Sequence, residues 1–319
     1  MQFYADHRHG SAKWAGAGEL ARAGLYGGKG VFLGLCPYTN QPLSLEGDAP
    51  LTLIGGSGSG KGTTILLYNN FYQGSMLRLD PKGEIGAITA AYQKAMGKAY
   101  YCINPSALHT GEPWQLPQHR VNPFDILKPD SPHLISDCMR IAAMLIPKNN
   151  EKSFFVNRPR QWLENLLLAY VLCYEHPTLT GFMGLVNLIQ SDFEAFTALT
   201  KTFCGLGNTD IKRTCAEIID RKKSAPEEYS GVMSTISTSL KFMADPQLQT
   251  LFGGADFSLD VLTRTNPAVV DIAFPAENLG IWSKALRLII GVAILYQQRN
   301  AGGAKPLFLI DEAAQLGQF

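Results

Sequence analysis

One glycine-rich stretch, Gly55–Thr64, constrains the fold more than any other part of the chain. An apolar run, Leu51–Ile54, precedes it, and a helix-compatible run, Ile65–Tyr68, follows it. Glycines let a backbone turn its N–H groups toward a phosphate that a Cβ atom would crowd, and the start of the next helix adds positive potential. Strand, glycine loop and helix in this order therefore predict a phosphate-binding P-loop.

The lysine of this stretch predicts how a nucleotide is held. Lys61 can reach the β- and γ-phosphates as a point charge. In the common pattern a Ser or Thr follows the lysine and its hydroxyl binds Mg²⁺, but here Gly62 holds that position. Either a threonine hydroxyl, with Thr63 as the metal-binding candidate, or a water takes the metal position. The predicted nucleotide-binding residues are Gly56, Ser57, Gly58, Ser59, Gly60, Lys61, Gly62, Thr63 and Thr64.

A second landmark lies near the other end of the chain. The run Pro306–Ile310 is apolar and predicts a strand, and Asp311 and Glu312 follow it directly. A carboxylate such as Asp311 is a suitable oxygen ligand for Mg²⁺. Glu312 is then the candidate catalytic base that orients and deprotonates an attacking water. A strand that ends in Asp-Glu is a weak signal alone, but together with a P-loop it strongly indicates a nucleotide hydrolase.

Strand patterns alternate with helix patterns on both sides of a long central segment. Strands are expected at 75–80, 99–103 and 268–274, and helices at 85–97 and 283–299. This alternation predicts an α/β fold with a parallel sheet, in which ligands bind beyond the carboxyl ends of the strands. Asp80, Lys82 and Glu84 follow such an end, so a role near the nucleotide and a solvated turn both stay open. Two short strands at 31–34 and 43–45 predict an edge hairpin.

The central segment, 131–252, has helical periodicity almost throughout. Its basic residues alternate with acidic ones, which favours a solvated helix surface over a nucleic-acid-binding face. Helices are expected at 133–146, 157–176, 180–190, 191–204, 210–223 and 230–244. We therefore divide the chain into the first part of a nucleotide-binding domain (1–130), an inserted all-α domain (131–262) and the second part of the nucleotide-binding domain (263–319).

Composition limits the class of protein. The net charge is +1, so no global basic excess indicates nucleic-acid binding. No apolar run approaches the roughly 18 residues of a membrane span, and the first residues do not resemble a signal peptide. The six cysteines are scattered and contain no C-x-x-C pair, which indicates reduced thiols. These features predict a soluble, cytoplasmic chain without a transmembrane segment.

Four stretches together resemble the VirD4/TraG family of type IV secretion coupling proteins. The resemblance runs through nearly the whole chain, and the second and fourth stretches separate this family from other P-loop proteins. The stretches are Gly56–Gly62, Leu79–Glu84, Asn122–Asp125 and Leu307–Gly317.

The resemblance implies a RecA-like P-loop core that uses ATP and Mg²⁺. It also implies a homo-hexamer on the cytoplasmic face of the bacterial inner membrane, with relaxase or relaxosome, single-stranded DNA and type IV secretion channel components as partners. The helical insertion corresponds to the domain that faces substrates and the relaxosome. Such hexamers use an arginine from a neighbouring subunit, for which Arg78, Arg158 and Arg287 are candidates.

Two features depart from the family pattern. Members of the family usually begin with transmembrane helices and continue well beyond the Asp-Glu strand. In RecA-like sheets the next strand inserts between the Asp-Glu strand and the P-loop strand and carries a residue that senses the γ-phosphate. We therefore expect either a truncated coupling protein or one half of a split one, active as an ATPase only when the remaining part is supplied.

Three functions follow from these observations. The first is an ATPase that delivers DNA–relaxase or protein substrates to a conjugation or secretion channel. The second is a non-hydrolysing module that binds nucleotide or docks substrates through its helices. The third is a different DNA-translocating P-loop ATPase, which fits the two nucleotide motifs but not the stretch Asp80–Glu84.

Overall fold

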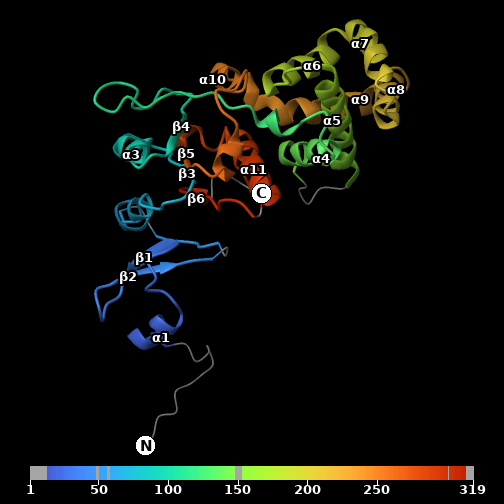
Figure 1. Cartoon of the computed structure of the whole chain (residues 1–319). Helices are drawn as coiled ribbons and strands as arrows, with labels where there is room; N and C mark the ends of the chain where they lie inside the picture. The colour runs from blue at the N-terminus through green and yellow to red at the C-terminus, as the bar shows by residue number, and fades with distance from the viewer. Residues whose placement is uncertain (1–12, 48–49, 56–57, 148–152, 301, 314–319) are drawn as a thin grey trace, which may run out of the picture. The chain divides into compact units, whose positions relative to one another are not determined.

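The structure is a computed structural model, and it describes residues 13–47, 50–55, 58–147, 153–300 and 302–313. It divides into two compact units, Met1–Gln73 and Gly74–Phe319, and each unit is described by itself. The colours of Figure 1 follow the chain from the first unit in blue to the end of the second unit in red.

The first unit contains a short helix, a hairpin and the helix that follows the glycine loop. The hairpin expected from the sequence forms, and its two strands pair antiparallel with a register shift between Phe32 and Gly34. Buried Asn69 ties the helix to the hairpin, because its amide accepts from the Phe32 N–H at 2.8 Å and donates to the Phe32 carbonyl at 3.1 Å. The elements are α1 (Ala17–Arg22), β1 (Val31–Leu35), β2 (Pro42–Leu45), the π-helical turn η2 (Gly62–Leu66) and α2 (Leu67–Asn69).

The strand expected at Leu51–Ile54 does not form, and this prediction is wrong for the structure. Residues 50–55 have no regular secondary structure, and Leu51, Leu53 and Ile54 are 50%, 50% and 91% exposed. A strand needs a neighbouring strand to pair its backbone N–H and C=O groups. No strand of the two described sheets pairs with this run.

The second unit is built on a parallel sheet with the strand order β4-β5-β3-β6. Its strands match the four runs that the sequence predicts, and Figure 1 shows helices α3 and α11 on opposite sides of it. This arrangement explains why the strands are apolar on both faces. The elements are β3 (Met76–Leu79), α3 (Glu84–Ala95), β4 (Ala99–Ile103), β5 (Ala268–Ile272), α11 (Ser283–Arg299) and β6 (Leu307–Ile310).

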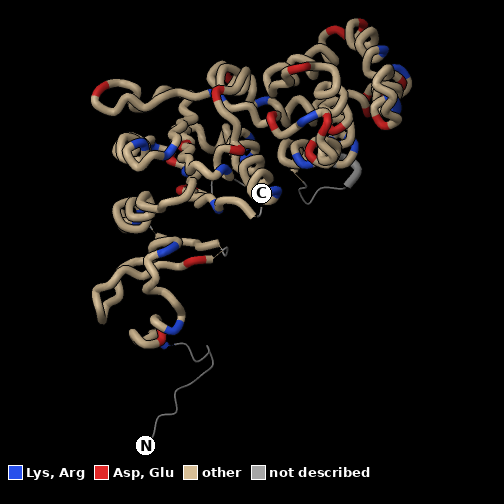
Figure 2. The backbone as a smooth tube through the Cα atoms, in the orientation of Figure 1, with Lys and Arg blue, Asp and Glu red and all other residues tan. Residues whose placement is uncertain are grey.

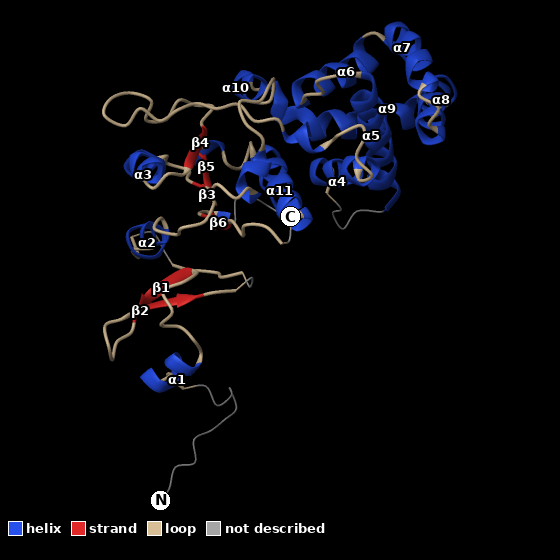
Figure 3. Cartoon of the chain, viewed as in Figure 1, coloured by secondary structure: helices blue, strands red, loops and turns tan. Residues whose placement is uncertain are grey.

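The central segment forms a group of helices without a strand in its described part, as Figure 3 shows. Polar side chains begin several of them: Asp192 accepts from the Ala195 N–H at 3.0 Å, and Asn208 accepts from the Ile211 N–H at 3.0 Å. The expected helices are confirmed with shifts of a few residues at their ends. They are α4 (Leu134–Leu145), α5 (Ser153–Cys173), α6 (Leu179–Ser191), α7 (Phe193–Gly205), α8 (Thr209–Ser224) and α9 (Pro226–Leu240). A short helix that the sequence did not predict, α10 (Pro246–Leu251), follows them.

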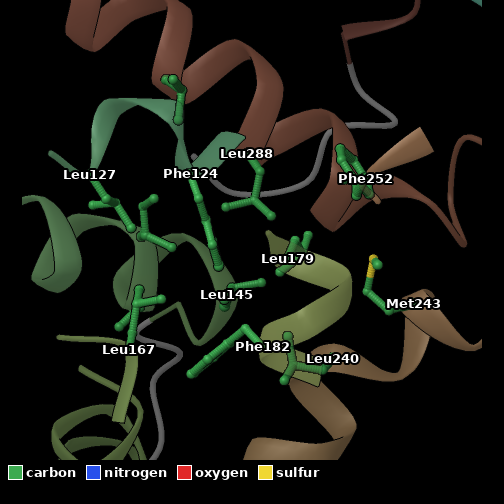
Figure 4. Packing of buried hydrophobic residues seen from close by; sticks show 14 of the residues in the cluster. Phe124, Leu127, Leu145, Leu167, Leu179, Phe182, Leu240, Met243, Phe252 and Leu288 are labelled. Atoms are coloured by element: carbon green, nitrogen blue, oxygen red, sulfur yellow. The ribbon is translucent and has the colours of Figure 1, made fainter. Parts of the chain in front are cut away.

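One connected hydrophobic core joins these helices to the sheet. Figure 4 shows part of it, where Phe124 points between the helices toward Phe182, with ring centroids 6.0 Å apart. Leu77 and Ile272 of the sheet belong to the same cluster as Leu179 of α6. Among the described residues, no helix is both long enough and apolar enough to cross a membrane.

Candidate functional site

The glycine loop of the first unit has the backbone that a phosphate cradle requires. Gly58 and Gly60 have φ angles of 75° and 85°, which residues with a Cβ atom rarely adopt. A Cβ atom at Gly55 would lie 2.6 Å from Ser59 Oγ and 3.3 Å from Lys61 Cγ. Gly58 and Gly60 therefore cannot be exchanged without backbone strain, and a side chain at Gly55 would require the Ser59 hydroxyl to rotate away. Gly56 and Ser57 lie outside the described residues.

The side chains that follow the glycines point back to the loop. Lys61 Nζ donates to the Gly55 carbonyl at 2.6 Å, so the lysine side chain reaches back across the loop to its first residue. The hydroxyls of Thr63 and Thr64 donate to the Gly60 carbonyl at 3.3 and 2.6 Å. Both threonines are exposed, so either hydroxyl can reach a ligand after a rotation about χ1. The glycine backbone and the Lys61 ammonium group fit a nucleotide phosphate, and the two threonine hydroxyls fit a divalent cation bound to it.

At Gly62, directly after the lysine, a hydroxyl side chain would fit. Gly62 begins the helical turn η2, and an added Cβ atom would have no neighbour within 4 Å. Its φ is not among the positive values. The glycine here is therefore not required by the local backbone, in contrast to Gly58 and Gly60.

The two carboxylates of the second unit lie at the carboxyl end of β6. Asp311 follows the last residue of the strand and is half-buried, and its Oδ1 accepts from the Glu312 N–H at 3.0 Å. Glu312 is exposed and has a φ of 55°, an uncommon value for a residue other than glycine. Strained residues of this kind cluster at functional sites. The described residues contain no group of three or more His, Cys, Asp or Glu that could hold a metal ion by themselves.

The register of the sheet brings a third carboxylate to the same edge. Leu79 of β3 pairs with Ile310 of β6, so Asp80 and Asp311 are the next residues on neighbouring parallel strands. Asp80 is only 3% exposed, and its Oδ2 accepts from the Gly86 N–H at 2.8 Å near the start of α3. Burial raises the pKa of Asp80 to about 6. Asp80 is therefore a buried support of α3 and not part of a solvated turn.

A buried polar network, which the sequence did not predict, lies in the strands next to Asp80. Asp271 of β5 accepts from Arg78 Nε at 2.6 Å and from Arg78 Nη2 at 2.7 Å, and both side chains are buried. The Tyr100 hydroxyl also donates to Asp271, and Arg78 Nη1 donates to Thr89 of α3 at 3.0 Å. Burial alone would lower the pKa of Arg78, but the charge of Asp271 raises it. The network joins three strands and α3.

This network excludes Arg78 as an arginine offered to a neighbouring subunit, because its exposed fraction is 0%. The other two candidates are also engaged. Arg158 forms an ion pair with Glu217, and Arg287, which is 7% exposed, donates to the Met144 carbonyl at 3.2 Å. The three arginines considered from the sequence therefore all have structural partners.

Charged residues on the helices are mostly interspersed by sign, as Figure 2 shows. Arg213 pairs with Asp210 at 2.7 Å, and Arg221 pairs with Glu228 at 3.5 Å. Lys222 Nζ lies 4.1 Å from the centre of the Phe193 ring. These partners support the interpretation of α8 as a solvated helix surface.

Sequence comparisons link the chain to conjugative transfer. A sequence model of the family described as "Type IV secretory system Conjugative DNA transfer" matches residues 13–319. Protein VirD4 of Agrobacterium fabrum is 26% identical over 335 residues, which cover 100% of this chain and 48% of that protein. Protein VirD4 of Rhizobium radiobacter is 27% identical and covers 97% of this chain and 45% of its own length. The chain thus spans about half the length of the curated relatives it matches.

Solved structures show the same fold at low sequence identity. The conjugative coupling protein TrwBΔN70, in a trigonal form with sulphate, has a TM-score of 0.55 and 14% identity, over 82% of this chain and 56% of that chain. TrwB in complex with ADP and Mg²⁺ has a TM-score of 0.54 and 15% identity, with the same coverage. The expected α/β fold, a RecA-like P-loop core with a parallel sheet and many helices, is confirmed.

Proposed function

Because the chain belongs to the type IV secretory system conjugative DNA transfer family, as a coupling protein of the VirD4/TraG type, we propose that it binds and hydrolyses ATP to deliver substrates to a secretion channel. The substrates are DNA–relaxase complexes or proteins. The single observation that carries the proposal is the glycine loop, whose left-handed Gly58 and Gly60 leave room for phosphates while Lys61 spans it.

The roles of the site residues follow from their chemistry. Lys61 exchanges the Gly55 carbonyl for the β- and γ-phosphates, and the backbone of Gly56–Thr64 surrounds them. Asp311, with Thr63 or Thr64, holds Mg²⁺, which neutralises phosphate charge when it is bound. Glu312 is exposed at a strained turn, where it accepts a proton from the attacking water. Complexes of TrwB with ADP and Mg²⁺ and with the GTP analogue GDPNP support a nucleotide with Mg²⁺ as the ligand.

The helices supply the substrate-facing part in this proposal. We assign residues 131–262 to an all-α domain that contacts relaxase and DNA, and residues 1–130 and 263–319 to the nucleotide-binding domain. The partners are relaxosome proteins, single-stranded DNA and channel components. We further propose that the protein works as a homo-hexamer at the cytoplasmic face of the inner membrane, where a neighbouring subunit contributes an arginine.

Hydrolysis of Mg·ATP, with and without single-stranded DNA, tests the proposal directly. The Glu312→Gln variant should retain nucleotide binding and lose turnover, because a glutamine cannot accept the proton. The Lys61→Ala variant should lose both. An Asp311→Asn variant that hydrolyses ATP as fast as the parent would contradict the assigned metal ligand.

The exposed run Leu51–Ile54 favours a second candidate function. A P-loop that is not anchored by a paired strand loses part of its preorganisation, which weakens nucleotide binding. The chain then acts as a docking module that binds substrate through its helices without turnover. Capture of a relaxase that requires residues 131–252 but is unchanged in the Lys61→Ala variant supports this candidate.

A further inference from the structure

Two of the six cysteines lie side by side in the helical part of the larger unit. Cys204 is in the last turn of α7 and Cys215 is in the second turn of α8, and Figure 1 shows these two helices next to each other. The Cys215 thiol donates a hydrogen bond to the Cys204 sulfur. All six cysteines are free thiols in the structure. We propose that Cys204 and Cys215 form a reversible disulfide by exchange with a low-molecular-weight disulfide, such as oxidised glutathione.

The turn between the two helices holds the cysteines together. The Leu206 N–H donates to the Phe203 carbonyl at 3.2 Å where α7 ends. Asn208 accepts from the Ile211 N–H at 3.0 Å where α8 begins. Gly207 has a φ of 76°, a left-handed value that lets the chain turn within the three residues between the helices. Because the connection is this short, the end of α7 packs against the first two turns of α8.

The two thiols differ in their exposure to solvent. Cys215 is 2% exposed and lies on the buried face of α8, between Ile211 and Ile218. Cys204 is half-buried and packs against the edge of the core. Burial and the neighbouring Cys204 sulfur raise the pKa of the Cys215 thiol to about 12, which makes it a poor nucleophile toward a dissolved molecule. A dissolved disulfide therefore reacts first with Cys204.

The exchange proceeds in two balanced steps. The Cys204 thiol loses its proton to solvent, and its sulfur attacks one sulfur of the dissolved disulfide. The S–S bond of that molecule breaks, and the released thiolate takes up a proton. The Cys215 sulfur, after losing its own proton, attacks the Cys204 sulfur and displaces the second thiolate, which is protonated in turn. In total, two cysteine thiols are oxidised to one disulfide, and one dissolved disulfide is reduced to two thiols.

Cys173 provides a contrast at the end of another helix. It is half-buried like Cys204 and is the last residue of α5. Burial is the cause that raises the pKa of Cys173, and no neighbouring thiol contributes within the described residues. Cys173 can therefore form a mixed disulfide with glutathione but has no thiol beside it with which to form an internal one. It is the matched control for Cys204.

Mass spectrometry of the full chain, incubated with oxidised and reduced glutathione, tests the proposal. Trypsin cleaves after lysine and arginine, so the two cysteines lie in separate peptides, 202–212 and 214–221. After free thiols are blocked, we expect these peptides to be joined, with two hydrogens less than the sum of their masses. Cys173→Ser should give the same joined pair in the same amount.

The single variants of the pair test the order of the two steps. In Cys215→Ser, Cys204 should stop at the mixed disulfide with glutathione. In Cys204→Ser, Cys215 should stay reduced because it is buried. Circular dichroism checks that each variant is folded, and Cys204→Ser should fold like the parent because it changes a half-buried side chain. A Cys215 that takes up glutathione as readily as Cys204 would contradict the assigned order.

The folded structure must favour the bond if the pair is a site and not a chance neighbourhood. The ratio of joined to reduced chain at a fixed glutathione ratio gives the effective concentration of one thiol beside the other. This value should be at least about tenfold higher in the folded chain than in urea. An equal or lower value in the folded chain, or a folded parent that forms only mixed disulfides, would overturn the proposal. Neither result depends on nucleotide, so the test is independent of the proposed function.

Discussion

The glycine loop of the first unit and the strand ends of the second unit hold their functional side chains in different ways. In the loop, Lys61, Thr63 and Thr64 donate hydrogen bonds to carbonyl oxygens at most six positions away. At the strand ends, Asp80 and Asp311 are placed by a parallel sheet, and Asp271 and Arg78, 193 positions apart, pair behind them. The loop is therefore a local structure, whereas the strand ends depend on long-range packing.

This difference predicts which substitutions change binding and which change folding. The Lys61 side chain of the loop can be replaced without disturbing a core, so its loss should reduce nucleotide affinity and little else. A residue of the buried network cannot be replaced without leaving a charge unpaired in a water-free interior. Four measurements, in order of decreasing expected effect, can break or sharpen this comparison.

The largest effect is expected for Asp271→Ala. The substitution leaves the fully buried Arg78 without its carboxylate, and removing one partner of a buried pair costs about 3–5 kcal/mol. Urea unfolding measures the loss. Asp256→Ala is the matched control, because its pair with Arg120 is 34% and 52% exposed and should contribute about 1 kcal/mol or less. Equal losses in the two variants would show that the network is not what distinguishes the strand ends.

The second effect separates binding from stability in the loop. Lys61→Ala removes charged hydrogen bonds of about 1.5–3 kcal/mol to phosphate, so the affinity for Mg·ATP should fall about 100-fold. The free energy of unfolding should change by no more than about 0.5 kcal/mol, because the side chain is partly exposed. Calorimetric titration gives the affinity, with exposed Lys29→Ala as the control. A variant that loses stability and affinity together would contradict the local character of the loop.

The third effect is a pH dependence of the strand ends that the loop should lack. The pKa of Asp80 is about 6 in the folded chain and lies near 3.8 in the unfolded chain, so the folded state binds the proton more tightly. Between about pH 4 and pH 6 the stability contribution of Asp80 therefore falls as pH rises, by up to about 1.4 kcal/mol per pH unit. Below this window the contribution is fully present.

Asp80→Asn removes the titration but keeps a carbonyl oxygen for the Gly86 N–H. The stability of the variant relative to the parent should thus rise from pH 4 to pH 6, as measured by urea unfolding at several pH values. The difference in stability between variant and parent removes the contributions of the other titrating groups, because both proteins contain them. A difference that stays constant with pH would mean that Asp80 has an ordinary pKa in the fold.

The same contrast explains what the sequence could predict. The left-handed glycines and the lysine of the loop could be recognised from the sequence, because the structure they form is local. The strand at Leu51–Ile54 was predicted wrongly, because an apolar run indicates a strand only when another strand pairs with it. Strand β6, with a similar run, does form because β3 lies beside it with the register Met76↔Leu307. Local pattern cannot supply that information.

The buried network escaped prediction for a related reason. Arg78 stands between Leu77 and Leu79, and Asp271 stands between Val270 and Ile272. A charge inside a strand buried on both faces requires a partner, so the two residues could have been recognised as buried charges. Their pairing could not, because it depends on the order of strands in the sheet.

The smallest effect tests whether the loop tolerates the serine or threonine of the common pattern. Gly62 has open space for a Cβ atom and lies in a helical turn, where glycine is less stable than alanine by about 0.5–1 kcal/mol. Gly62→Ala and Gly62→Ser should therefore both keep or slightly raise stability. Gly60→Ala, at a φ of 85°, should lower it.

The pair of Gly62 variants also identifies the metal-binding hydroxyl. Only serine adds an oxygen at the position after Lys61, so Gly62→Ser should raise the Mg²⁺ dependence of ATP affinity severalfold over Gly62→Ala, measured by titration with and without Mg²⁺. If the two variants bind Mg·ATP equally, the hydroxyls of Thr63 and Thr64 or a water already fill the metal position. If the threonines fill it, their hydroxyls donate to the Gly60 carbonyl when the site is empty and turn to the metal ion when nucleotide binds. The local hydrogen bonds of the loop would then describe the ligand-free state of the binding site.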